Sequence, residues 1–279
     1  MLRIGVRAHD FGKGTPEELA KKIAEKKASY IQLALTKALT GMNTGPGTLN
    51  PGMAHYIRDT FARHQIHIAV LGCYINPIHP DPVERRKALE RFKEHLRFAR
   101  DFGCSIVGTE TGTVTPDFSY HPDTHSAKGF KLILKSVAEL VAEAEKFGVF
   151  VGIEGVTKHS VSTPEKMARV IETIKSNNLQ VILDPCNFIS EDNYERQEEI
   201  IKQAFDLFGD RIQILHAKDF TIENGKKKIV PIGEGLLNYE LLMGLIKKHK
   251  PHLEILLEAV DPANVERIHQ YLADIYERV

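Results

Sequence analysis

The feature that most constrains the fold is a regular alternation of two kinds of segment along the chain. Eight short apolar segments, rich in β-branched residues, are separated by longer amphipathic ones. The short segments are residues 2–6, 30–35, 67–73, 105–109, 149–154, 179–184, 212–216 and 253–258. Segments that are apolar on both faces are typical of parallel strands covered by helices. The alternation therefore predicts repeated β–α units.

The longer segments have the apolar spacing and the end signals of helices. One apolar face is formed by Leu89, Phe92, Leu96 and Ala99, and similar faces recur between the other strands. Helix starts are marked by a capping hydroxyl followed by proline, as at Thr15-Pro16. We therefore expect a helix after each strand.

Eight β–α units without a break in composition predict a (β/α)₈ TIM barrel, an α/β fold formed by a single domain over residues 1–279. Barrels of this type often reach about 250 residues as one unit. An open doubly wound sheet is the alternative. It usually has fewer strands, and no GxGxxG motif follows the first strand of this sequence.

Charge and hydropathy exclude several classes of function. The chain has 37 basic and 37 acidic residues, whereas sequence-independent nucleic-acid binding needs a basic surface. The three cysteines are too sparse for a disulfide framework. The sequence has neither the apolar run of a signal peptide nor a run long enough for a membrane span. We therefore expect a cytoplasmic protein that binds neither nucleic acid nor membrane.

Two long segments rich in Gly and Pro, residues 36–52 and 112–126, interrupt the alternation. Both follow predicted strands, so in a barrel they lie at the C-terminal face, where substrate loops are found. We expect them to be irregular or mobile lids. Residues 226–228 follow Asn224-Gly225 and are expected at a solvated hairpin tip.

Polar residues end four consecutive predicted strands. They are Glu154, Asp184, His216 and Glu258. Strand ends of a barrel meet at the active-site mouth, so these four side chains are expected to converge. Three carboxylates without a cation would repel one another, and an oxygen-rich set with one nitrogen suits a divalent ion such as Mn, Mg, Co or Zn. We therefore predict a metal site for one such ion.

Other polar residues near strand ends are candidate substrate contacts. Those that we select are His9, Glu110, His159, Asn187 and Lys218, with Arg7 and Asp219 beside them. Histidines within the predicted helices, such as His95, are expected at the surface.

The sequence resembles the xylose-isomerase-like TIM barrels, a family of sugar and sugar-phosphate isomerases and epimerases. The resemblance extends over nearly the whole chain. It is carried by the spacing of the four strand-end residues and by LDPCN, LHAKD, IGEGLLNYELL, LGCYINPIHPD and VGTETGT.

The resemblance implies one metal held by the four strand-end residues, with Glu154 and Glu258 also passing a proton to and from the substrate. The metal would polarise the carbonyl and stabilise an enediolate. The expected partner is a small sugar or sugar phosphate, and relatives often form homo-oligomers.

One position departs from the epimerases of the family. They usually have His three residues after the strand-six Asp, where this chain has Asn187, which cannot titrate. A sibling activity, an aldose–ketose isomerase or an inosose-type keto-polyol dehydratase, therefore stays open. A hydrolase like the apurinic-site endonucleases is less favoured, because residues 219–235 contain no His for a three-metal cluster. A non-catalytic sugar-binding protein is a further alternative.

Overall fold

Every predicted apolar segment forms a strand in the computed structural model, which describes residues 2–279. These strands are β1 (Arg3–Arg7), β2 (Tyr30–Leu33), β3 (His67–Gly72), β4 (Ile106–Glu110), β5 (Phe150–Glu154), β6 (Leu179–Leu183), β7 (Ile212–Ala217) and β10 (Glu254–Leu257). Each pairs in parallel with its neighbours, and β10 pairs with both β7 and β1, which closes the barrel. The fold is therefore a single-domain TIM barrel, and the open sheet is excluded.

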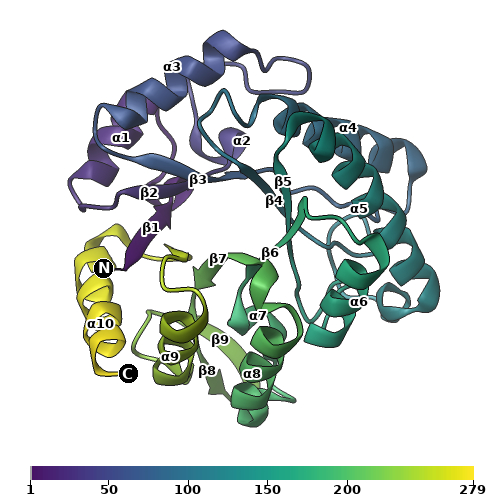
Figure 1. The fold of residues 1–279 in the computed structure, drawn as a ribbon, viewed down its shortest axis with the longest axis vertical. Helices are drawn as coiled ribbons and strands as arrows, with labels where there is room; N and C mark the ends of the chain where they lie inside the picture. Colours follow the sequence, from purple (N-terminus) through teal and green to yellow (C-terminus); the bar gives the residue numbers. More distant parts are fainter. Residues whose placement is uncertain (1) are drawn as a thin grey trace.

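Helices surround the strands on the outside of the barrel (Figure 1). The longer ones are α1 (Pro16–Ala24), α3 (Pro51–Ala62), α4 (Pro82–Phe98), α5 (Ala127–Phe147), α6 (Pro164–Ile174), α8 (Gln197–Phe208), α9 (Tyr239–His249) and α10 (Val265–Arg278). Two single-turn helices, α2 (Leu35–Ala38) and α7 (Pro185–Phe188), follow β2 and β6.

Local signals in the sequence act at the ends of the helices. Thr15 and Glu18 form a complete capping box at the start of α1, in which each side chain accepts the other residue's backbone N–H. Gly148 ends α5 in the left-handed conformation, with φ of 60°. The expected surface position of His95 is wrong, because this side of α4 packs inward and leaves the residue only 2% exposed.

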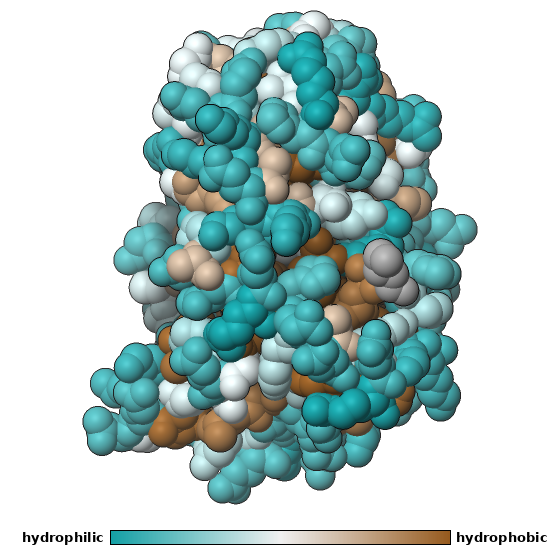
Figure 2. Space-filling model, turned by 90° about the vertical axis from the view of Figure 1, so that its left-hand side faces the viewer, coloured by the Kyte–Doolittle hydropathy of each residue, from teal (hydrophilic) through white to brown (hydrophobic). Residues whose placement is uncertain are grey.

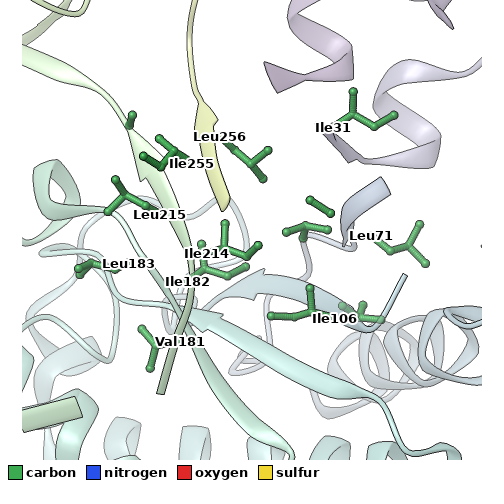
Figure 3. Close-up of a cluster of buried hydrophobic side chains, with 14 of the residues drawn as sticks. Ile31, Leu71, Ile106, Val181, Ile182, Leu183, Ile214, Leu215, Ile255 and Leu256 are labelled. Carbon is green, nitrogen blue, oxygen red and sulfur yellow. The ribbon is translucent and has the colours of Figure 1, made fainter. Parts of the chain in front are cut away.

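Buried aliphatic side chains of β2, β3, β4, β6, β7 and β10 pack on both faces of the barrel strands, toward the interior and toward the helices (Figure 3). Among them, Ile31, Val181 and Leu256 have no exposed surface. The side of the molecule shown in Figure 2 is mostly hydrophilic, with separate apolar patches between charged side chains. Within residues 2–279, no helix is sufficiently long and apolar to span a membrane.

A hairpin that is not part of the barrel follows β7. Its strands are β8 (Asp219–Glu223) and β9 (Lys226–Val230), which pair antiparallel. Asn224 and Gly225 at its turn have positive φ, as a two-residue hairpin turn requires. The predicted tip is therefore present with Lys226 and Lys228 exposed, but Lys227 is partly buried: its Nζ donates to the carbonyls of Cys186 and Ile189, both at 2.6 Å.

Both Gly- and Pro-rich segments leave the C-terminal ends of strands, as predicted. Segment 36–52 is fastened to α4 and not free. The Glu94 carboxylate accepts the backbone N–H groups of Gly47 and Leu49, each at 3.0 Å, and Arg91 donates to the Gly45 carbonyl at 2.7 Å. This charged pair fastens the segment to α4, and between α2 and α3 the segment is irregular, as expected.

Candidate metal centre

Four polar side chains meet at the C-terminal face of the barrel. Glu154 ends β5, Asp184 follows β6, His216 lies near the end of β7, and Glu258 follows β10. These strands are consecutive neighbours in the sheet. Each residue offers one ligand atom, and the four atoms lie within 4.8 Å of one another. The strand ends therefore bring the four predicted metal ligands together.

His216 lies between two of the carboxylates with no exposed surface. Its Nδ1 is 3.2 Å from Glu154 Oε2 and 3.0 Å from Glu258 Oε2. Burial lowers the pKa of His216, but the attraction of the two carboxylates outweighs it and raises the pKa to about 10. In the metal-free protein, Nδ1 therefore holds a proton that a cation at the same place would displace.

The positively charged side chains of Lys218 and Arg7 partly neutralise the carboxylates. Lys218 Nζ lies 2.9 Å from both Asp184 Oδ2 and Glu258 Oε1. Arg7 Nη1 donates to Glu258 Oε1 at 2.5 Å. Burial alone raises the pKa of Glu258, but hydrogen bonding and charge attraction from His216, with help from Lys218, lower it well below the usual value. Burial dominates at Asp184, whose pKa is raised.

The donor set fits a divalent cation. It offers three carboxylates and one imidazole nitrogen, and three of the four residues are at most 2% exposed. Oxygen-rich sets with one imidazole suit Mn, Mg, Co and Zn, and a dication would offset the repulsion of the crowded carboxylates. These four residues are therefore a candidate metal site.

Three of the predicted substrate contacts line the same mouth. Asn187 Nδ2 donates to Glu154 Oε1 at 2.6 Å. Glu110 ends β4 beside Glu154, and His159 Nδ1 is 3.6 Å from Glu110 Oε2. Burial, with the charge of Glu154, raises the pKa of Glu110 to about 7. Burial lowers the pKa of His159 to about 4, so this imidazole is neutral near pH 7.

The other two predicted contacts are held differently. Lys218 faces the carboxylates, as described above. His9 lies in a short 3-10 helix (Ala8–Phe11) directly after β1. Burial and the nearby Arg7 lower the pKa of His9 to about 4. The five predicted contacts thus come from five different strand ends.

Two residues at the site were not predicted from the sequence. The amide oxygen of Gln32, in β2, lies 2.6 Å from His216 Nε2. The Gln32 Nε2 donates in turn to the hydroxyl of Tyr74, which follows β3. The only local signal for Gln32 is a polar residue in the middle of the apolar run YIQLAL.

Solved structures share the fold of this chain at low sequence identity. A xylose isomerase-like TIM barrel protein from Mycobacterium smegmatis, in complex with magnesium, is 15% identical, with a TM-score of 0.75 over 99% of this chain and 98% of that one. A D-tagatose 3-epimerase-like protein is 18% identical, with a TM-score of 0.76 over 99% of both chains. D-psicose 3-epimerase in the presence of D-fructose is 14% identical, with a TM-score of 0.73 over 100% and 99%.

The comparison with curated proteins found no match. The family model described as xylose isomerase-like TIM barrel matches residues 10–275, which is nearly the whole chain. The barrel topology and the converging strand ends agree with that match. The chain therefore belongs to the xylose isomerase-like TIM barrel family.

Proposed function

We propose that the protein is a divalent-metal-dependent isomerase or epimerase of a small sugar or sugar phosphate. The observation that carries the proposal is the buried cluster of Glu154, Asp184, His216 and Glu258 at the mouth of the barrel. Family membership supports it, as does the likeness in fold to proteins described as sugar epimerases.

The four clustered residues would hold the metal. When bound, a divalent cation polarises a carbonyl and stabilises negative charge on its oxygen. The remaining work is proton transfer at the carbon beside that carbonyl, which needs a positioned base and acid. Glu258 is the proposed base, because its carboxylate lies at the mouth of the barrel, held between His216 and Lys218.

Glu154 is the proposed second acid/base group. Its Oε2 faces His216, while Oε1 accepts the Asn187 amide N–H, so the carboxylate has a fixed orientation. Glu110, His9, His159 and Lys218 are the proposed contacts to substrate hydroxyl or phosphate groups. Asn187 also orients Glu154 and cannot take part in proton transfer itself.

A keto-polyol dehydratase is the second candidate, and Glu110 is the observation that favours it. A carboxyl with a pKa of about 7 is partly protonated at neutral pH. Such a group can donate a proton to a departing hydroxyl. In this reaction the same base removes the proton beside the carbonyl, and water leaves from the next carbon.

The test is a panel of ketoses, aldoses, inososes and their phosphates, incubated with Mn-loaded protein in deuterated water. Isomerase or epimerase activity predicts a rearranged sugar with deuterium at the carbon beside the carbonyl. Loss of water from an inosose would support the dehydratase. If metal-loaded protein converts none of these compounds, the proposed function is wrong.

Two substitutions then separate metal binding from proton transfer. Glu154→Gln and Glu258→Gln keep an oxygen ligand but cannot accept a proton at neutral pH. With metal in excess, each variant should lose about 10²–10⁴-fold in kcat. Glu143→Gln is the control, because this buried glutamate pairs with Arg97 on the outer helices. Near-normal turnover in either metal-loaded site variant would show that this glutamate is only a ligand.

A further inference from the structure

We propose that Gln32 is a positioning residue that fixes His216 so that its Nδ1, and not its Nε2, binds the metal. The inference rests on the metal site of the proposed function, but not on the identity of the sugar.

The Gln32–His216 contact lies inside the barrel. Both side chains have no exposed surface, and His216 Nε2 lies 2.6 Å from Gln32 Oε1. Strand β2 is not a sheet neighbour of β7, so the Gln32 side chain reaches His216 through the interior. The contact is therefore shielded from bulk water.

The contact decides which ring nitrogen is available to a cation. An amide oxygen only accepts hydrogen bonds, so it selects the form of His216 that carries a proton on Nε2. The other nitrogen, Nδ1, faces Glu154 and Glu258, the two carboxylates of the metal cluster. A metal-binding histidine is commonly oriented by a hydrogen bond from its second nitrogen, and Gln32 provides that bond here.

Tyr74 is the second hydrogen-bond partner of the Gln32 amide. The Gln32 Nε2 donates to the Tyr74 hydroxyl, so the amide oxygen is directed at His216. If the amide group were rotated by 180°, its N–H would face the Nε2–H of His216. The amide oxygen would then no longer accept the hydrogen bond from His216. The Tyr74 ring is itself held by Lys37, whose Nζ lies 4.4 Å from the ring centre.

An uncharged acceptor suits this position. The cluster already contains Glu154, Asp184 and Glu258. A carboxylate beside His216 would add a further negative charge to a buried site, and an amide accepts the same hydrogen bond without it. A Gln32→Glu variant therefore keeps the acceptor and should bind metal at least as tightly as the wild-type protein.

The experiment measures Mn²⁺ affinity of the metal-free protein by titration calorimetry. Gln32→Met, which keeps the volume but not the acceptor, should weaken binding about 10–100-fold. Gln32→Glu should restore it. Gln180→Met is the matched control, because Gln180 is a buried barrel glutamine whose amide bonds Asn177 and Gln213, neither of which belongs to the metal cluster. Wild-type affinity in Gln32→Met, or an equal loss in Gln180→Met, would overturn the inference.

A second measurement needs no variant. In Zn²⁺-loaded wild-type protein labelled with ¹⁵N-histidine, NMR should show His216 with metal on Nδ1 and a proton on Nε2. Metal on Nε2, or no metal binding at all, would overturn the inference whether or not Gln32→Met folds. Metal binding with the expected NMR pattern, but without conversion of any sugar, would refute the proposed function and leave the role of Gln32 intact.

Discussion

At the scale of single residues, Lys218 gives the metal-free site a cation of its own. Its Nζ contacts Asp184 and Glu258 at 2.9 Å, and its side chain is 11% exposed. Removing one partner of a buried ion pair leaves an uncompensated charge, whereas a bound dication would supply compensation from another source. Lys218 therefore matters most to the stability of the protein without metal.

We predict that Lys218→Met lowers the free energy of unfolding by about 3–5 kcal/mol in the presence of chelator. Added Mn²⁺ should recover much of this loss, because the cation takes over the neutralisation of the carboxylates. Lys93→Met, which breaks ion pairs with Glu90 and Glu139 outside the barrel, should show no such recovery. Denaturant unfolding with and without metal measures both. A loss that metal does not reduce would contradict this account.

His95 predicts a pH dependence of stability. Burial first, and then the charge of Arg91, lowers its pKa to about 4, against about 6.5 in an unfolded chain. Between these values the unfolded chain binds the proton and the folded protein does not, so stability falls as pH drops from about 6.5 to 4. The full contribution is about 3 kcal/mol, from roughly 1.4 kcal/mol per pKa unit.

We therefore expect His95→Gln to show a smaller loss of stability than the wild-type protein over this pH range. His9 and His159, whose pKa values are also lowered to about 4, should still make the stability of this variant depend on pH. His64→Gln, at an exposed histidine, is the control. Unfolding curves at several pH values provide the test, and an unchanged slope in His95→Gln would show that His95 does not cause it.

At the scale of elements, one carboxylate organises the segment after the hairpin. Asp219 accepts backbone N–H groups from Phe220, Gly233, Gly235 and Leu237 at 2.8–3.1 Å. It is 1% exposed and directly follows Lys218 in the chain. The sequence motifs LHAKD and IGEGLLN therefore meet through this residue, which ties the hairpin to the barrel and helps to hold Lys218 in place.

The packing at Gly235 gives a prediction for this segment. A Cβ there would lie 2.1 Å from Asp219 Oδ1, so Gly235→Ala must displace the loop and break some of its bonds to Asp219. Each buried group left without a partner costs about 1–3 kcal/mol. Gly209→Ala, where the nearest neighbouring atom is 3.8 Å from the new Cβ, should be nearly neutral. Equal stability of the two variants in denaturant unfolding would show that Asp219 does not restrain the loop.

At the scale of the whole molecule, the sequence predicts those strands and site residues whose positions depend on local sequence pattern. The alternation of apolar and amphipathic segments locates all eight barrel strands, and strand ends locate the four converging residues. Partners that depend on distant packing have no such signal. Gln32 contacts His216 across 184 positions of the chain, and Glu94 in α4 contacts Gly47 in the irregular segment before α3. The predicted strand over residues 30–35 ends two residues too late. In the structure β2 ends at Leu33, because α2 already begins at Leu35.

The arrangement of the proposed metal ligands makes a prediction for the barrel as a whole. They come from β5, β6, β7 and β10, which are consecutive, so a bound cation would join one half of the sheet. Without it, the repulsion of three carboxylates acts on the ends of the same strands. Removing the metal should therefore loosen this half more than β2, β3 and β4, which carry no ligand.

Hydrogen exchange of the metal-loaded and chelator-treated protein, followed by mass spectrometry, measures this difference. Exchange should increase at the C-terminal ends of β5, β6, β7 and β10, and much less in β2 to β4. A free metal concentration of 100 times the Kd should also raise the free energy of unfolding by about 2.7 kcal/mol. Asp184→Asn, with a weakened site, should respond less to the same treatment. A uniform change around the barrel would mean that the cation acts on the fold in general, and a change limited to β2 to β4 would place it elsewhere.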